Sequence, residues 1–191
     1  TKIISMLLEH SRIEVNKATQ CGNTALFVAV REDYIDIVSM LLEHPNIDIN
    51  SSVHYGRTPL TQAVYKGYVD IVDKFLQHDQ IDINDTNIVG TTPLHIAARQ
   101  GHKEIVDLLL GQSNTDVNKV NDNGETALIN AVCGGHADIV RQLLKRPKIN
   151  VNFVDYNGNT ALFEAAYCGY EEIVSMLLEK PDIDVNKADE R

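Results

Sequence analysis

The sequence predicts an all-α solenoid in which five copies of one two-helix unit are stacked side by side. Three series of residues support this prediction, because each recurs with a step of 34 residues and without an insertion. The first series opens a Thr-(Ala/Pro)-Leu-x-x-Ala segment and consists of Thr24, Thr58, Thr92, Thr126 and Thr160. The second is an Ile-Val pair that begins at residues 37, 71, 105, 139 and 173. The third is an asparagine at positions 16, 50, 84, 118, 152 and 186.

The asparagine series divides the chain into repeats. Cutting after each asparagine gives a partial repeat, 1–16, then complete repeats 17–50, 51–84, 85–118, 119–152 and 153–186, and a stub, 187–191. We therefore expect a single repeat array over residues 1–191, with a leading helix at 1–16. Both ends fall inside a repeat, and residues 3–9 lack the polar outer face of a capping repeat, so we expect a longer parent array.

Each repeat is expected to begin with a short helix that starts after the threonine. A threonine hydroxyl can accept a hydrogen bond from a free backbone N–H, and Pro59 and Pro93 follow where no N–H is needed. Leu60, Ala63 and Val64 form the face expected to be buried, and the small residue lets a second helix approach closely. A residue with left-handed backbone is expected to end this helix. It is Asp33, Gly67, Gly101, Gly135 or Gly169, according to the repeat.

A second helix and a projecting hairpin complete each repeat. The helix begins near an acidic residue that suits its positive end: Asp36, Asp70, Glu104, Asp138 or Glu172. Its Ile-Val-x-x-Leu-Leu pattern places apolar side chains on one face. Pro45, Pro147 and Pro181 are expected to stop it. The polar stretch that follows closes on a glycine, at residue 22, 56, 90, 124 or 158, and predicts a tight reversal of the chain.

The composition disfavours several classes of function. Lys and Arg total 17 against 27 for Asp and Glu, and the net charge of −10 disfavours binding to nucleic acid or to an anionic membrane surface. The apolar runs are too short to span a bilayer, so we expect no membrane insertion. Three cysteines without a close pair favour free thiols and a cytoplasmic location. We expect the chain to be a monomer.

No motif in the sequence points to catalysis or to a cofactor. His10, His44 and His78 share one repeat position, but neighbouring helices lie about 8–10 Å apart, too far for ligands of one zinc ion. The same step separates Cys133 from Cys168, so a disulfide between them is not expected. Neither a nucleophile elbow nor a phosphate-binding loop is present in the sequence. We therefore expect a protein without catalytic activity, metal or cofactor.

The repeats resemble the ankyrin repeat family over essentially the whole chain. The third repeat carries the fullest match, with Gly90-Thr91-Thr92-Pro93-Leu94-His95, Ala97-Ala98, Gly101-His102, Ile105-Val106, Leu109-Leu110 and Asp116-Val117-Asn118. Each repeat is one residue longer than the usual length of about 33. Isoleucines occupy positions where the family typically has alanine, and they predict a slightly deeper core: Ile47, Ile81, Ile149 and Ile183. Histidine at the fourth motif position occurs only at His95, which predicts fewer hydrogen bonds between repeats.

The asparagine series is interpreted as a set of turn residues that bind backbone groups. Asn50 and Asn84 also begin glycosylation sequons, but their place in the series favours the structural role. The resemblance adds a further possibility, because some ankyrin repeats are hydroxylated at this asparagine. The positions would be Asn50, Asn84, Asn118 or Asn152. The structural role is favoured there too.

The resemblance implies that hairpin tips and first helices line a concave groove, where this family typically binds other proteins. The expected site residues, taken from variable positions, are Arg31, Tyr55, Arg57, Tyr65, Lys66, Ile88, Val89, Arg99, Gln100, Asp122, Tyr156 and Tyr167. Further variable positions on the same side are Gln20, Cys21, Asn23, Val28, Glu32, His54, Gln62, Thr91, Ile96, Asn123, Glu125, Asn130, Cys133, Asn157, Asn159, Glu164 and Cys168. Hairpin tips vary in any repeat protein, so a structural role for each position stays open.

The charges on this side change sign along the array. The basic residues lie in the first three repeats: Arg31, Arg57, Lys66 and Arg99. The acidic residues lie later: Asp122, Glu125 and Glu164. Together with exposed tyrosines, which are common at binding hot spots, this pattern predicts a protein partner segment with acidic and aromatic or aliphatic groups. The alternative is a targeting or regulatory segment of a larger enzyme, channel or secreted effector.

Overall fold

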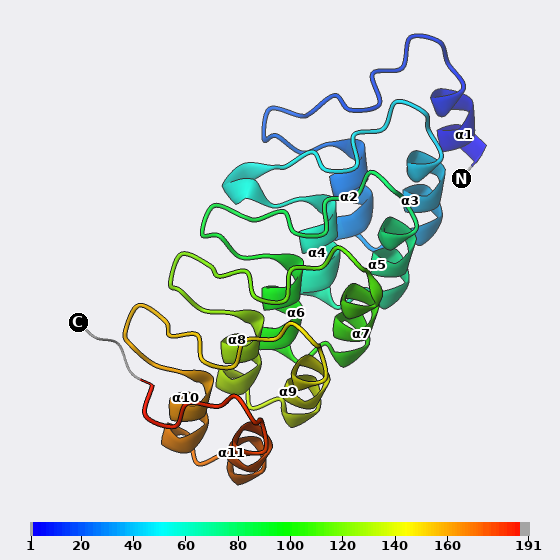
Figure 1. Ribbon diagram of the computed structural model, residues 1–191. Coiled ribbons are helices and arrows are strands. Elements are labelled where there is room, and N and C mark those ends of the chain that lie inside the picture. Colours follow the sequence, from blue (N-terminus) through cyan, green and yellow to red (C-terminus); the bar gives the residue numbers. More distant parts are fainter. Residues whose placement is uncertain (1, 188–191) are drawn as a thin grey trace.

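The computed structural model describes residues 2–187 and is a stack of helix pairs with loops projecting from one side (Figure 1). An inner row of helices borders these loops: α2 (Ala25–Arg31), α4 (Pro59–Lys66), α6 (Pro93–Gln100), α8 (Ala127–Cys133) and α10 (Ala161–Tyr167). An outer row lies beside it: α1 (Lys2–Leu8), α3 (Ile35–Leu42), α5 (Val69–Leu76), α7 (Lys103–Gly111), α9 (Ala137–Leu144) and α11 (Glu171–Leu178). The prediction of an all-α solenoid of paired helices is confirmed.

The leading helix is shorter than expected. Helix α1 ends at Leu8, whereas the sequence suggested a helix in the whole of 1–16; residue 1 lies outside the described residues. After Leu8 the chain turns, with hydrogen bonds from His10 N to Leu7 O at 3.1 Å and from Ile13 N to His10 O at 2.9 Å. The reason is the register of the repeat: residues 9–16 form the loop that follows every outer helix, as the segment after Leu42 does.

The inner helices begin and end as predicted. The Thr92 hydroxyl accepts a hydrogen bond from His95 N at 3.3 Å, and the four other threonines of the series accept the equivalent bond. Gly67 and Gly101 end α4 and α6 in the left-handed conformation, with φ of 74° and 80°. Asp33 takes the same conformation after α2, with φ of 59°, so it does substitute for glycine there.

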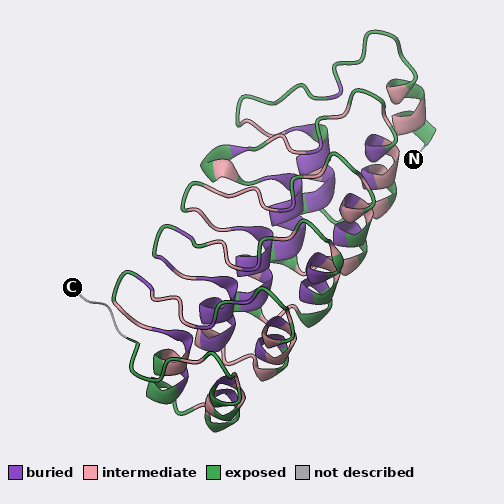
Figure 2. Ribbon diagram, viewed as in Figure 1, coloured by how far each residue is buried: buried purple, intermediate pink, exposed green. Residues whose placement is uncertain are grey.

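The core runs continuously between the two rows of helices. Figure 2 shows buried residues concentrated on the facing sides of both rows. Leu60, Ala63 and Val64 are all buried, as predicted, and they belong to the same cluster as Leu109 of the outer row. Each helix pair buries its apolar side against the neighbouring pairs, so no repeat has a core of its own.

The additional isoleucines do extend the core beyond the outer helices. Ile149 is buried, and Ile47, Ile81 and Ile183 are partly buried and pack against the main cluster. The loops after α3, α5, α9 and α11 are thereby held by apolar contact as well as by hydrogen bonds.

The asparagine series links successive repeats through their backbones. The Asn50 side chain donates from Nδ2 to Gln80 O at 2.8 Å and accepts at Oδ1 from Asp82 N at 3.0 Å. Asn84 makes the same pair of bonds to Asn114 O, at 2.7 Å, and to Asp116 N, at 2.9 Å. Each of these amides therefore satisfies one donor and one acceptor of the next repeat, as a turn residue that binds backbone should.

The hairpin tips are also joined to one another. Ile88 N donates to Tyr55 O at 3.2 Å, Asp122 N to Val89 O at 3.2 Å, and Tyr156 N to Asn123 O at 2.9 Å. These bonds connect the tips of the second to the fifth complete repeats, so the tips form one continuous row. Side chains on that row are consequently held at fixed spacing from repeat to repeat.

Candidate functional site

A cavity of about 450 Å³ lies between the row of hairpin tips and the inner helices. Its lining comes from the second, third and fourth complete repeats, with Tyr65 on α4, Arg99 on α6 and Asn130 on α8. We call the surface between the hairpin row and the inner helices the groove, and this cavity its central pocket. A concave site of this size, lined by apolar and polar groups together, is typical of ligand recognition.

Four of the twelve expected site residues line the central pocket: Arg57, Tyr65, Arg99 and Gln100. The other eight lie outside it: Arg31, Tyr55, Lys66, Ile88, Val89, Asp122, Tyr156 and Tyr167. Tyr55, Ile88, Val89 and Tyr156 are exposed on the hairpin tips, where the backbone bonds described above hold them in one row. Their assignment to a binding site stays a prediction.

The pocket also contains residues that the sequence analysis did not propose as site residues. Thr61 and His95 belong to helix caps, and Asn87 and Asn121 each accept two backbone N–H groups within their own hairpin. The signal that could have found them is geometric: the start of each inner helix lies at the base of the hairpin, and so faces the groove.

The two arginines of the pocket carry unneutralised charge. The Arg57 guanidinium lies 5.8 Å above the centre of the Phe27 ring, a cation–π contact that orients it. Neither Arg57 nor Arg99 forms an ion pair with any residue in the range 2–187. Two guanidinium groups without an ion-pair partner beside one cavity make this part of the groove electropositive in an otherwise acidic chain.

Glu125 is the carboxylate of the pocket, and side-chain amides hold it in place. One of its oxygens, Oε2, accepts from Asn121 Nδ2 at 2.8 Å and from Asn130 Nδ2 at 3.3 Å. These bonds fix the position of the negative charge without neutralising it. The pocket therefore presents positive charge from Arg57 and Arg99 and negative charge from Glu125.

His95 lies at the base of the pocket and joins two repeats. Its ring Nε2 is 3.0 Å from Glu125 O and its Nδ1 is 3.2 Å from Thr92 N. Because a carbonyl oxygen only accepts, Nε2 must carry the proton and Nδ1 must accept, which is the neutral ring. Burial lowers the pKa of His95, although the bond to Glu125 acts in the opposite direction. The pocket thus has a neutral imidazole below its charged rim.

The part of the groove beyond the pocket is acidic and aromatic. Glu164 accepts a hydrogen bond at Oε1 from Asn159 Nδ2 at 2.9 Å. Phe163 and Tyr167 stack with ring centroids 6.1 Å apart and planes inclined by 11°. Burial raises the pKa of the Cys133 thiol, and the Glu164 charge adds to this effect, so this cysteine is not activated as a nucleophile.

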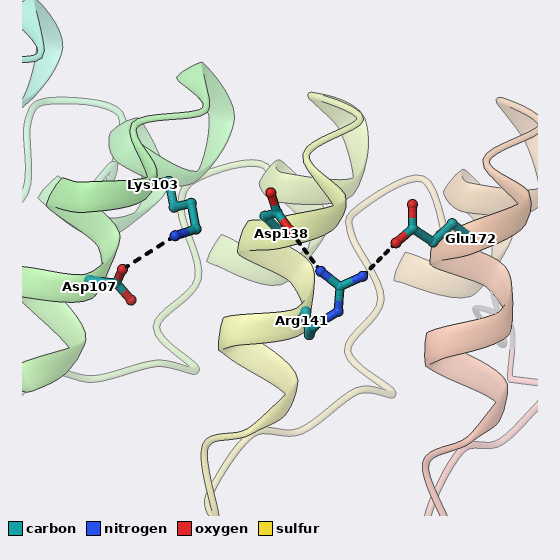
Figure 3. Close-up of polar contacts among 5 residues, drawn as sticks. All are labelled: Lys103, Asp107, Asp138, Arg141 and Glu172. Atoms are coloured by element: carbon teal, nitrogen blue, oxygen red, sulfur yellow. Dashed lines mark hydrogen bonds and ion pairs between the residues drawn. The ribbon is translucent and has the colours of Figure 1, made fainter.

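Charges on the outer helices are arranged differently from those in the groove. The Arg141 guanidinium on α9 bridges Asp138 of its own helix, at 2.7 Å, and Glu172 of α11 (Figure 3). Lys103 lies 3.9 Å from Asp107 on α7 (Figure 3). Arg141 and Lys103 on this face therefore form ion pairs, whereas Arg57 and Arg99 in the groove form none among the described residues.

The remaining candidate groups have structural neighbours. The ring Nδ1 atoms of His10 and His44 each accept a backbone N–H two residues further on, from Arg12 and Asn46, at 3.2 Å. Among residues 2–187, no three His, Cys, Asp or Glu side chains are grouped so that they could hold a metal ion. In the same range, none of the helices combines the length and the apolar character needed to cross a membrane.

Comparison with known proteins agrees with the repeat geometry. A family model described as "Ankyrin repeats (3 copies)" matches residues 1–53, 46–121 and 94–189. The chain belongs to the ankyrin repeat family. Proteins of this family generally act as protein-interaction modules and are typically non-catalytic.

Solved structures of ankyrin repeat proteins have the same architecture. The ankyrin repeat protein EF0377 is 32% identical, with a TM-score of 0.87 over 93% of this chain and 91% of that one. An ankyrin repeat domain (ABAYE2397) from Acinetobacter baumannii AYE is 35% identical, with a TM-score of 0.86 over 93% of this chain and 90% of that domain. A search of curated proteins finds no match.

Proposed function

We propose that this ankyrin array is a non-catalytic module that binds a partner protein in its groove. The observation that carries the proposal is the central pocket, where Tyr65 and Ile96 offer apolar surface beside the unpaired guanidinium groups of Arg57 and Arg99. Unpaired cations next to an exposed tyrosine are typical of protein-binding hot spots.

The partner that fits this surface is an extended or helical segment with acidic and aromatic or aliphatic groups. Its acidic groups would face Arg57 and Arg99, and its apolar groups would contact Tyr65 and the exposed tips of the hairpin row. Because backbone bonds hold the tips of successive repeats together, little order has to be gained on binding. The shape of the binding site is therefore largely formed before the partner binds.

The free cysteines support a reducing compartment for this function. Cys21 and Cys168 are exposed and unpaired, and Cys133 is also a free thiol. We therefore propose a cytoplasmic partner. Nothing in the fold or in the comparisons favours the alternative of a targeting or regulatory segment.

Alanine variants of the pocket test the proposal. A partner isolated with the wild-type array as bait should lose about 2 kcal/mol or more of binding free energy, roughly 30-fold in Kd, on Tyr65→Ala or Arg99→Ala. Lys103→Ala is the matched control, because Lys103 is exposed but lies on the outer row. Calorimetric titration of the purified partner measures all three. Equal affinity of the wild type and both pocket variants would place the binding surface elsewhere on the array.

A further inference from the structure

The charge of the central pocket suits one type of anion. Arg57 and Arg99 contribute two positive charges, Glu125 contributes one negative charge, and the buried His95 ring is neutral. The pocket therefore has a net charge of +1, although the whole chain has −10. A monovalent anion compensates this charge, whereas a divalent one leaves an excess negative charge beside Glu125.

The positions of the two arginines favour a group that lies between them. Arg57 is oriented by the Phe27 ring at the base of one hairpin, and Arg99 lies near the end of α6 in the next repeat. Among the other described arginines, Arg31 pairs with Glu32 and Arg141 with Asp138 and Glu172, whereas Arg12 and Arg146 form no ion pair. Arg57 and Arg99 differ from Arg12 and Arg146 because both line one pocket, and neither is paired with the Glu125 carboxylate there. Guanidinium groups recognise carboxylates through paired N–H donors.

The groove continues beyond the pocket on both sides. The inner row of helices runs from α2 in the first complete repeat to α10 in the fifth, while the pocket is lined from the second to the fourth repeat. A segment lying along the tips would therefore pass over the pocket instead of ending in it. The carboxylate that reaches the pocket is then a side chain of the segment, and not its terminus.

We propose, on the basis of the protein-binding function above, that the central pocket binds one aspartate or glutamate side chain of an extended partner segment. Its carboxylate lies between Arg57 and Arg99, and an adjoining apolar residue contacts Tyr65 and Ile96. Glu125 is the specificity-determining residue: its fixed negative charge disfavours a doubly charged phosphate group at the same place.

A random 12-residue peptide library displayed as an internal loop provides the probe, because it contains no free carboxyl terminus. Peptides are selected for binding to the wild-type array and counter-selected for binding to the Tyr65→Ala variant. The selected peptides should share an acidic residue at one position and an apolar residue next to it. Selected peptides are then made with amidated ends and with Glu, Gln or phosphoserine at that position. The affinity of each peptide is measured for three arrays: the wild type, the double arginine variant (Arg57→Gln and Arg99→Gln together) and the Glu125→Gln variant.

The proposal predicts a coupled pattern of affinities. Replacing the peptide Glu by Gln should weaken binding to wild type about tenfold, and should have little effect on the double arginine variant. The phosphoserine peptide should bind wild type less tightly than the Glu peptide, and Glu125→Gln should reduce or reverse that preference. Gln can still accept the Asn121 amide, so the pocket keeps its shape. Lys103→Gln on the outer row is the control and should bind like the wild type.

Two kinds of result would overturn the inference, and they differ in what they mean for the proposed function. The carboxylate site alone would be contradicted if groove-dependent peptides showed no enriched acidic residue. It would also be contradicted if replacing the peptide Glu by Gln weakened binding to the double arginine variant as much as binding to wild type. A selection in which every peptide binds Tyr65→Ala and the double arginine variant as tightly as wild type would contradict groove binding itself. Circular dichroism melts of each variant confirm that it is folded before its affinity is interpreted.

Discussion

At the scale of single residues, one capping position shows how the same local role can have different consequences. Thr61 and His95 occupy equivalent places and both complete a capping box with the preceding threonine. The Thr61 hydroxyl is bonded within its own helix start, to Thr58 N at 2.8 Å and to Thr58 O at 2.9 Å. The longer His95 ring reaches Glu125 O in the next repeat. Histidine therefore adds a link between repeats and a group that titrates.

His95 should make stability depend on pH. Because its pKa is lower in the folded state than in the unfolded state, the unfolded chain gains a proton first as pH falls. The stabilisation is complete above the unfolded pKa, about 6.5, and is lost below it. Urea melts at pH 7.5 and pH 5.0 should show a smaller loss of stability for His95→Thr than for wild type.

The Thr variant is a suitable control because Thr61 shows that threonine completes the cap. At pH 7.5 His95→Thr should cost about 1–2 kcal/mol, because the bond to Glu125 O and part of the ring packing are lost. If the wild type and His95→Thr lost the same free energy of unfolding between pH 7.5 and pH 5.0, this account would be contradicted.

At the scale of elements, the turn between the two helices of a repeat depends on the next repeat. Gly101 has φ of +80°, and a Cβ placed there would lie 2.6 Å from His136 Cε1. Gly169 has φ of +73° at the same position of the fifth repeat, and no heavy atom of the described residues lies within 4 Å of such a Cβ. The two glycines share the backbone conformation but differ in whether a ring packs against them.

This pair separates backbone strain from crowding between repeats. Gly169→Ala should cost about 1–2 kcal/mol through the left-handed backbone alone. Gly101→Ala should cost about 1–3 kcal/mol more, because the His136 ring must also move. Equilibrium urea unfolding measures both losses. If Gly169→Ala proved to be as costly as Gly101→Ala, packing of the ring would not be what restricts residue 101.

At the scale of the whole molecule, the array is stabilised by contacts between neighbours along one direction. Leu109 in the middle of the stack is 0% exposed, whereas Leu7 on α1 is 51% exposed. The same repeat position therefore buries very different amounts of apolar surface, according to whether helices lie on both sides of it.

Truncation at these two positions should reflect that difference. Leu109→Ala should destabilise the array by about 2–5 kcal/mol, because it leaves a cavity in a filled core. Leu7→Ala should cost much less, since half of its side chain is already in contact with water. Denaturant melts of the two variants provide the comparison. Equal losses would contradict stabilisation through neighbouring repeats.

Much of the fold could be predicted from the sequence because its determinants are local and repeat every 34 residues. The threonine caps, the glycines after the inner helices and the asparagine links all have the predicted roles. The length of α1 is the exception: the helix ends at Leu8 because residues 9–16 of the partial repeat form the same loop as in the complete repeats.

The candidate site was less predictable from the sequence. Arg57, Tyr65, Arg99 and Gln100 were identified as variable positions, but nothing in the sequence showed that they share one pocket with His95. Three different repeats contribute to that pocket, so its lining depends on how neighbouring repeats are placed relative to one another.

The repeat length, the helix pair and the capping residues follow from the sequence alone, because each depends on interactions within a few residues or on a strict period. Which charges remain unpaired depends on the tertiary structure. Arg141 pairs with Glu172 of the neighbouring repeat, whereas Arg57 and Arg99 form no ion pair in the described part of the chain. The physical reason is that an ion pair requires two side chains to converge within a few ångströms, and stacking places residues 31 positions apart in contact while sequence order does not.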